Sequence, residues 1–244
     1  MIQDIVDLHT HTTASGHAYN TIYEMAEGAA SRGVQLLGIS DHGPAMEGSA
    51  TRHYFHASRH VPRLIKGVQI LFGIEFNILD HQGTVDLTDE FAAPLDYAIA
   101  SLHVECIPPG TKEGNTSAYL GAMKNPKVFM LGHPDDGSFA SDFDMIACAA
   151  KEQKVLIELN EASLNPGGYR KNAIENAHRL MAACKRFGTR IIVSSDAHSE
   201  PEILQHQNAW KLLQELDYPE ELIANNSVEK TLVWLEERKR YTAW

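Results

Sequence analysis

Residues 7–11 have the sequence DLHTH, and a further histidine, His17, follows six residues later. The apolar residues around this stretch predict a β-strand over Ile5–His9, in which successive side chains point to opposite faces of a sheet. His9 and His11 would then leave the strand end on the same side, about 6 to 7 Å apart. Two imidazoles placed in this way can bind a metal ion, although a single such pair is more often structural. The other strands therefore decide between the two interpretations.

Short apolar runs rich in β-formers recur along the chain, each followed by loop residues and a helical pattern. Strands buried on both faces that alternate with helices predict a parallel sheet. Seven such units favour an α/β fold closed into a distorted, TIM-barrel-like (β/α)7 barrel with outer helices, and an open doubly wound sheet is the alternative. The seven predicted strands are Ile5–His9, Leu36–Ser40, Val68–Ile78, Tyr97–His103, Val128–His133, Val155–Asn160 and Arg190–Ser195.

Several helix boundaries are marked by capping residues. Thr21 with Glu24 forms a potential capping box, and Gly33 stands where a left-handed C-terminal cap belongs. Ser199 with Glu202, together with a proline between them, predicts the start of a later helix. A further helix is predicted to end before Gly188 and to bury one apolar stripe, formed by Ile174, Ala177, Leu180, Met181 and Cys184.

The composition is that of a globular protein, with 244 residues, 43% hydrophobic residues and a formal net charge of -11. No linker or low-complexity segment interrupts it, which predicts a single domain over residues 1–244. No signal peptide or membrane span is expected. The spacing and odd number of the three cysteines argue against disulfides and favour a cytoplasmic location; they are Cys106, Cys148 and Cys184. The acidic charge makes a nucleic-acid partner unexpected.

The thirteen histidines are concentrated in small motifs at the predicted strand ends. Six of the seven strands carry a metal-ligand residue type at or near their ends. In parallel barrels the carboxyl ends of the strands form the active-site face, so these residues would converge in one cavity. The motifs are DLHTH at 7–11, His17, Ser40-Asp41-His42, Gly73-Ile74-Glu75, Leu102-His103, Gly132-His133-Pro134 and Ser195-Asp196-Ala197-His198.

In this order the motifs resemble those of the polymerase and histidinol phosphatase (PHP) family, from about residue 4 to 199. Details around residues 16–19 and 41–46 look closest to the YcdX-type bacterial phosphatase branch of that family. The resemblance implies a single PHP domain, a distorted seven-stranded barrel and a centre of three divalent metal ions, usually zinc. A donor set of imidazoles and carboxylates without thiolates suits zinc, and manganese or iron would also accept it.

The resemblance also implies how the nine ligands are shared. His9, His11, Glu75 and Asp196 would hold the first ion, and Glu75 would bridge to the second. The second ion would also take His103 and His133, and the third would take His17, His42 and His198. Of these residues, Glu75, Asp196 and His198 are predicted to act directly in catalysis.

Three divalent cations bring more positive charge than two carboxylates return, so the centre favours an anionic substrate. The predicted activity is hydrolysis of a small phosphomonoester by metal-bound hydroxide. The alternatives are a phosphodiesterase or exonuclease, an amidohydrolase-like enzyme acting on C–N bonds, and a metal-binding domain without catalysis.

A second group of polar residues has weaker predicted roles. Asp7 and Asp41 could orient ligand imidazoles or make ordinary loop hydrogen bonds. Glu158 and Asn160 end the one strand without a ligand and could face the same cavity. Two loop arginines, Arg52 and Arg170, could contact phosphate. Structural or surface positions are expected for the other histidines, His53, His56, His60, His81, His178 and His206.

Overall fold

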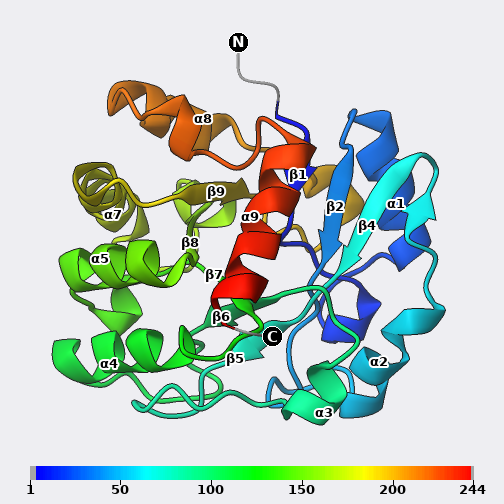
Figure 1. Ribbon diagram of the computed structural model, residues 1–244, viewed down its shortest axis with the longest axis horizontal. Helices are drawn as coiled ribbons and strands as arrows, with labels where there is room; N and C mark the ends of the chain where they lie inside the picture. Colours follow the sequence, from blue (N-terminus) through cyan, green and yellow to red (C-terminus); the bar gives the residue numbers. More distant parts are fainter. Residues whose placement is uncertain (1–3, 243–244) are drawn as a thin grey trace.

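The computed structural model describes residues 4–242, which form two mainly parallel sheets (Figure 1). One sheet has the strand order β1-β2-β4-β3 and the other the order β5-β6-β7-β8-β9. Only β3, which was not predicted, runs antiparallel to its neighbour. The strands are β1 (Val6–Asp7), β2 (Leu36–Ile39), β3 (Leu64–Ile65), β4 (Val68–Phe72), β5 (Glu75–Asn77), β6 (Ala98–Ser101), β7 (Val128–Leu131), β8 (Leu156–Asn160) and β9 (Ile191–Ser194).

The predicted strand over Val68–Ile78 is divided between the two sheets. Its first part is β4 and its second part is β5, with an interruption at Gly73 and Ile74. Isolated parallel bridges connect the sheets at both edges, one between His42 and Glu75 and one between Thr10 and Ala197. The predicted α/β fold with a distorted, TIM-barrel-like ring of seven strand positions is thus confirmed, and its two seams are single bridges instead of continuous ladders.

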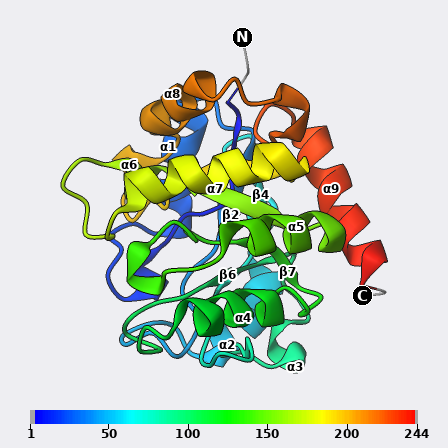
Figure 2. The same cartoon turned by 90° about the vertical axis from the view of Figure 1, so that its left-hand side faces the viewer.

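Helices surround the ring. Figure 2 shows α4, α5 and α7 stacked over the five-stranded sheet, and Figure 1 shows α1 beside β4 and α9 crossing one end of the ring. Within residues 4–242, no helix is both long and apolar enough to cross a membrane. The α-helices are α1 (Ile22–Ser31), α2 (Arg52–His56), α3 (Asp89–Ala92), α4 (Lys112–Ala122), α5 (Phe143–Gln153), α6 (Glu161–Leu164), α7 (Ala173–Phe187), α8 (Gln207–Glu215) and α9 (Val228–Tyr241). The 3-10 turns are η1 (Thr13–Ser15), η2 (Ala57–His60), η3 (Gly137–Phe139), η4 (Glu200–Glu202) and η5 (Glu220–Leu222).

The predicted helix ends are largely confirmed. Both hydrogen bonds of the Thr21 capping box are present at α1, and Gly33 has a left-handed φ of 79°. The apolar stripe of α7 is buried except at Ile174, which is 45% exposed because it lies in the first turn. The capping box at Ser199 opens only the single turn η4, so the prediction of a helix there was wrong, and α8 begins several residues later.

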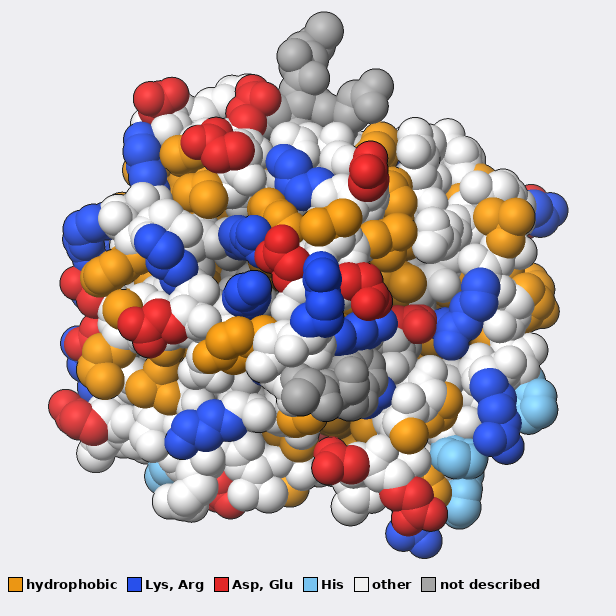
Figure 3. Space-filling model, viewed as in Figure 1, with side chains coloured by type: hydrophobic (Ala, Val, Ile, Leu, Met, Phe, Trp, Pro, Cys, Tyr) orange, Lys and Arg blue, Asp and Glu red, His pale blue; other side chains and the backbone are white. Residues whose placement is uncertain are grey.

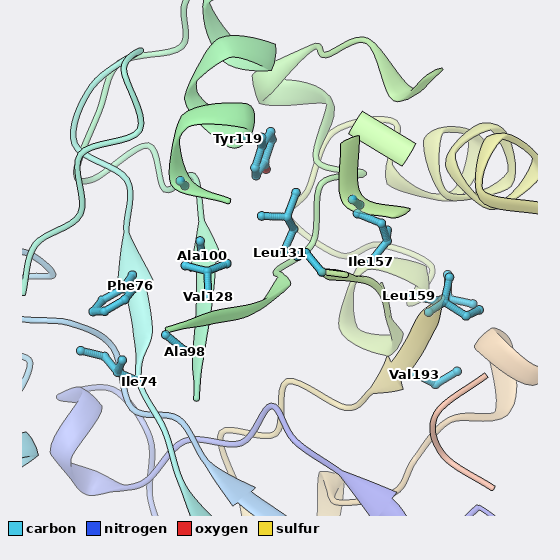
Figure 4. Close-up of a cluster of buried hydrophobic side chains, with 14 of the residues drawn as sticks. Ile74, Phe76, Ala98, Ala100, Tyr119, Val128, Leu131, Ile157, Leu159 and Val193 are labelled. Atoms are coloured by element: carbon cyan, nitrogen blue, oxygen red, sulfur yellow. The ribbon is translucent and has the colours of Figure 1, made fainter. Parts of the chain in front are cut away.

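The core has two layers. Figure 4 shows part of the outer layer, where strand residues such as Ile157 and Leu159 pack beneath the helices. The inner layer lies inside the ring and includes Leu8 and Tyr97, whose hydroxyl donates to the Leu8 carbonyl. A Cβ atom at Gly38 would lie 2.1 Å from the Tyr97 hydroxyl oxygen, so a glycine is required where this ring crosses the barrel.

Helix α9 covers the amino-terminal end of the ring. It is held there by a buried arginine, Arg238, which is 1% exposed. Its guanidinium donates to the carbonyls of Met123 and Asn125 after α4, to Gln153 at the end of α5, and to Val128. Cations are favourable at helix carboxyl ends, where carbonyls lack partners within the helix. Figure 3 shows this face, on which acidic and basic side chains are interspersed around α9.

We expect Arg238→Met to lower the free energy of unfolding by about 2 to 4 kcal/mol, because four carbonyls lose a charged donor while the methionine still fills the volume. Arg240→Met, at an exposed position of the same helix, is the matched control. Urea unfolding followed by circular dichroism measures both. Equal stability of the two variants would contradict the assigned role of Arg238.

Candidate metal centre

All nine predicted ligands lie at the carboxyl end of the ring. Glu75 is the first residue of β5, seven others follow the ends of β1, β2, β6, β7 and β9 by two to four residues, and His17 lies just after the turn η1. The backbone brings distant segments together here, because the His11 amide donates to the Ala197 carbonyl and the Glu75 amide to the Asp41 carbonyl. The seams of the barrel are therefore the places where the site is assembled.

The Glu75 carboxylate is the centre of the cluster and is fully buried. Its Oε1 lies 3.0 Å from His133 Nε2 and 3.2 Å from His103 Nε2. Its Oε2 faces the other way, 2.7 Å from His42 Nδ1, 3.4 Å from His9 Nε2 and 3.6 Å from His11 Nε2. The two oxygens thus serve different groups of imidazoles, which is the geometry that a bridging carboxylate needs.

Asp196 forms the opposite side of the same group. Its Oδ1 lies 3.2 Å from His11 Nε2 and 3.5 Å from His9 Nε2. Two donors bound to one zinc ion at about 2.0 to 2.1 Å would be roughly 3.3 Å apart in a tetrahedral site. The Nε2 and Oδ1 atoms of these three residues, which lie within 4.8 Å of one another, therefore fit a shared ion.

His17 and His198 form the outer part of the cluster. Their Nε2 atoms are 3.0 Å apart, and the His17 ring stacks at 5.0 Å from the ring of His42. The His198 side chain is 25% exposed, whereas that of His9 is fully buried. The Nδ1 atom of His42 faces Glu75, so this imidazole lies between the inner and outer groups.

The pattern of satisfied and unsatisfied atoms fits a metal site. His9 Nε2, His11 Nε2, His42 Nδ1 and Glu75 Oε2 are buried and have no hydrogen-bond partner. His42 Nδ1 is close to Glu75 Oε2 but is not aligned for a hydrogen bond. Buried polar atoms are rarely left without a partner, and here they all point to one place. Divalent cations would satisfy them, so the residues present fit the predicted metals.

The opposite nitrogens of several imidazoles are held by neighbouring side chains. Glu158 Oε1 accepts from His9 Nδ1 at 2.7 Å, and Asn77 Oδ1 accepts from His103 Nδ1 at 2.6 Å. Such bonds fix the tautomer that leaves Nε2 free as a ligand. Glu158, considered a cavity residue from its strand position, is thus tied to a ligand. Asn77 was missed, although it follows Glu75 by two residues and so shares its face of the strand.

His11 is held through a relay. Its Nδ1 lies 2.9 Å from Ser15 Oγ, and that hydroxyl donates to Asp41 Oδ1 at 2.7 Å. Asp41 also accepts from the Tyr54 hydroxyl and from the backbone of Thr12. An orienting role was predicted for Asp41 but not for Ser15, because a single serine in a loop has no sequence pattern that indicates a contact with His11.

Charges in the cluster are strongly coupled. Burial opposes ionisation of Glu75, but the imidazoles of His42, His9 and His103 outweigh it and hold the pKa of this carboxyl well below its ordinary value. Burial, His198 and His42 lower the pKa of His11, which keeps this imidazole neutral. Only neutral imidazole binds a metal, so the His11 environment favours the ligand form.

Two proposed ligands have unusual backbone conformations. His133 and Asp196 have positive φ values of 31° and 57°. Such conformations cost free energy for residues with a side chain and persist where the surrounding structure holds them. The His133 amide donates to Glu158 Oε2 at 2.7 Å, and Asn160 Nδ2 donates to Asp196 Oδ2 at 3.2 Å. The end of β8 therefore supports both strained positions.

Six of the nine proposed ligands line a cavity of about 910 Å³, namely His17, His42, His103, His133, Asp196 and His198. Arg170 also lines it, with a side chain that is 5% exposed. Its guanidinium donates to Asp196 Oδ2 at 2.7 Å and to Asn160 Oδ1 at 3.0 Å. Arg170 thus holds one oxygen of Asp196 and leaves Oδ1 directed at the imidazoles of His9 and His11.

The remaining weaker candidates lie elsewhere. Asp7 accepts from the backbone amides of Ser195 and Leu204, which agrees with the loop hydrogen-bond alternative. Arg52 lies over the ring of Phe91, 4.8 Å from its centroid, and does not line the cavity. None of the other six histidines, His53, His56, His60, His81, His178 and His206, lines it either.

Comparisons with known proteins agree on one family. The family model described as PHP domain matches residues 7–226. A "Probable phosphatase" of Acetivibrio thermocellus is 41% identical over 235 residues, which are 96% of each chain. A protein of Clostridium acetobutylicum that is also named "Probable phosphatase" is 41% identical over 232 residues, covering 95% of this chain and 94% of that protein.

Solved structures show the same fold at low sequence identity. Histidinol phosphate phosphatase from Lactococcus lactis, complexed with zinc, L-histidinol and phosphate, is similar with a TM-score of 0.60 at 16% identity, covering 88% of this chain and 95% of that one. A chain of an archaeal ribonuclease P structure with mature tRNA has a TM-score of 0.58 at 15% identity, covering 96% of this chain and 91% of its own.

We expect Glu158→Gln to weaken metal binding about 10- to 100-fold, because an amide can donate to His9 Nδ1 and move the imidazole proton to Nε2. Competition with a chromophoric chelator measures the affinity. Glu229→Gln, on the exposed side of α9, is the matched control. Unchanged affinity in Glu158→Gln would show that the carboxylate does not orient a ligand.

Proposed function

This chain belongs to the PHP domain family, and from that premise we propose that it is a metal-dependent phosphatase that hydrolyses a small phosphomonoester. The observation that carries the proposal is the Glu75 carboxylate, whose two oxygens face separate groups of imidazoles, and three of these, His42, His103 and His133, line the cavity. The relatives named as phosphatases and the zinc-containing histidinol phosphate phosphatase support it.

The proposed centre holds three divalent ions, with zinc preferred and manganese or iron as alternatives. His9, His11, Glu75 and Asp196 would hold the first ion. Glu75, His103 and His133 would hold the second, in line with their positions around Oε1. The third would be held by His17, His42 and His198, and the His17 ring stacks against the rings of the other two.

When bound, divalent cations supply Lewis acidity and lower the pKa of water towards neutrality, which is the chemistry that phosphomonoester hydrolysis requires. The chain contributes charge and position. Glu75 and Asp196 return only two negative charges, so the centre keeps a net positive charge that favours a phosphate dianion. His198 is one of the ligands that are exposed to the cavity, where it can contact the phosphoryl group.

Arg170 has a positioning role in this scheme. Its bond to Asp196 Oδ2 keeps the carboxylate from rotating, and the opposed charges stabilise each other in a buried setting. Burial opposes ionisation of Asp196, but His9 and Arg170 together hold the pKa of this carboxyl well below its ordinary value. Asp196 is therefore held in the ionised form that can bind a metal.

We expect two to three equivalents of transition metal per chain and complete loss of p-nitrophenyl phosphate hydrolysis after removal of the metal by a chelator, with recovery on adding zinc or manganese. Elemental analysis and steady-state assays measure both. A panel containing bis(p-nitrophenyl) phosphate and amide substrates tests the alternative hydrolases. Absence of metal, even after reconstitution, or turnover of diesters alone would contradict the proposal.

We expect Glu75→Gln to lose up to two ions and nearly all activity, because the amide keeps the shape but lacks the charge that holds two cations near each other. His17→Ala should lose about one ion, because this residue contacts only the outer group. Anomalous scattering and elemental analysis compare the two variants. Full occupancy and near wild-type turnover in Glu75→Gln would rule out the bridging role.

A further inference from the structure

The part of the cavity away from the proposed metal ligands is lined by charged, apolar and uncharged polar side chains, and the uncharged polar ones form a group. They come from η3, from the loop between α6 and α7, and from the segment before α8 together with the first turn of that helix. We call this group the polar wall, and it consists of Ser138, Asn165, Tyr169, Gln205, Gln207 and Asn208. A phosphate ion would occupy only a small part of a 910 Å³ cavity, so the polar wall faces the alcohol part of a substrate.

Much of the hydrogen-bonding capacity of the polar wall is free. The side chains of Ser138, Asn165 and Tyr169 have no hydrogen bond to any residue in the range 4–242. Asn208 uses its amide nitrogen on Glu161 Oε1, at 2.8 Å, and keeps its oxygen free. These groups are both donors and acceptors, which is the mixture that sugar hydroxyls match.

Two of the carboxylates that line the cavity, those of Glu161 and Glu202, are already engaged by backbone amides. Glu161 accepts from the amides of Asn208 and Ala209 and so caps α8. Glu202 Oε2 accepts from the amides of His198 and Ser199 at 2.7 and 3.0 Å. Such bonds occupy part of the hydrogen-bonding capacity of these two carboxylates, and their charge disfavours a second phosphate beside them.

Tyr169 adds an aromatic surface to the polar wall. It is 81% exposed, and within residues 4–242 its ring contacts the Arg170 guanidinium, which lies 5.0 Å from the ring centroid. An aromatic side chain held at a cavity mouth with so little packing offers a face to a ligand. Arg170 is itself fixed by Asp196, so the ring is tied to the metal centre.

We propose that the polar wall recognises a neutral polyhydroxylated alcohol, so that the substrates are monophosphates of sugars or polyols. This inference rests on the proposed phosphatase function. In the reaction the bond from phosphorus to the sugar oxygen breaks, a bond from phosphorus to a water oxygen forms, and the sugar oxygen takes up a proton. The hydroxyls of the departing sugar remain hydrogen-bonded to Asn165, Tyr169 and Asn208.

The test compares the double variant Asn165→Ala with Tyr169→Phe against wild type on the metal-loaded enzyme. The variant removes two hydrogen-bonding groups but keeps the aromatic ring, and Tyr23→Phe on exposed α1 is the matched control. For glucose 6-phosphate and ribose 5-phosphate we expect kcat/KM to fall about 10-fold, mainly through KM. For p-nitrophenyl phosphate, which has no hydroxyls, we expect a change of less than about twofold.

Equal losses on all substrates, or a wild-type preference for phosphoethanolamine or fructose 1,6-bisphosphate, would overturn the inference. Calorimetric binding of glucose 6-phosphate gives a readout that does not need turnover. Weaker binding by the double variant supports the polar wall even if no phosphomonoester is hydrolysed, an outcome that would reject only the phosphatase proposal. Unchanged binding overturns the polar wall while leaving p-nitrophenyl phosphate hydrolysis to decide the proposed function.

Discussion

The buried negative charge of Glu75 is the constraint on which the mouth of the barrel depends. An ionised carboxylate removed from water costs several kcal/mol unless opposite charge and hydrogen bonds compensate it. The side chains around Glu75 are imidazoles, and their nearest nitrogens at His9, His11 and His42 have no other partner. Neutral imidazoles cannot cancel a charge, but they can hold cations that do. The free-energy cost of burying the Glu75 charge is therefore lowered when the surrounding imidazoles hold metal ions.

The apolar interior of the barrel increases the need for opposite charge beside Glu75. Tyr97 and Leu8 fill the ring directly behind the ligands, with Gly38 leaving room for the tyrosine ring. This apolar floor keeps water away from the cluster, so electrostatic interactions there are weakly screened. The interruption between β4 and β5 also contributes to the site. It places Glu75 at a seam of the barrel, where the backbone of residues 41–43 pairs with it.

The fold and the convergence of the ligands could be predicted because both follow from periodicity. Strand parity places His9 beside His11, and parallel strands bring their carboxyl ends together. The division of Val68–Ile78 could not be seen, because apolar residues of the same β-rich kind continue on both sides of Gly73, while the break is set by closure of the ring. The contact of Ser15 with His11 and the burial of Arg238 depend on loops and helices far apart in sequence, for which no local pattern exists.

The separation between strand ends and loops explains how one centre can serve different substrates. The ligands belong to the strand ends and to the turn at His17, where the barrel geometry determines their positions. The polar wall belongs to η3, to the loop after α6, and to the segment before α8 with the first turn of that helix, all of which lie outside the ring of strands. Arg170 connects the ligand cluster with the polar wall, because its guanidinium contacts both the Asp196 carboxylate and the Tyr169 ring. Changes in these loops can therefore alter the alcohol that is recognised without disturbing the metals, provided that Arg170 keeps its place.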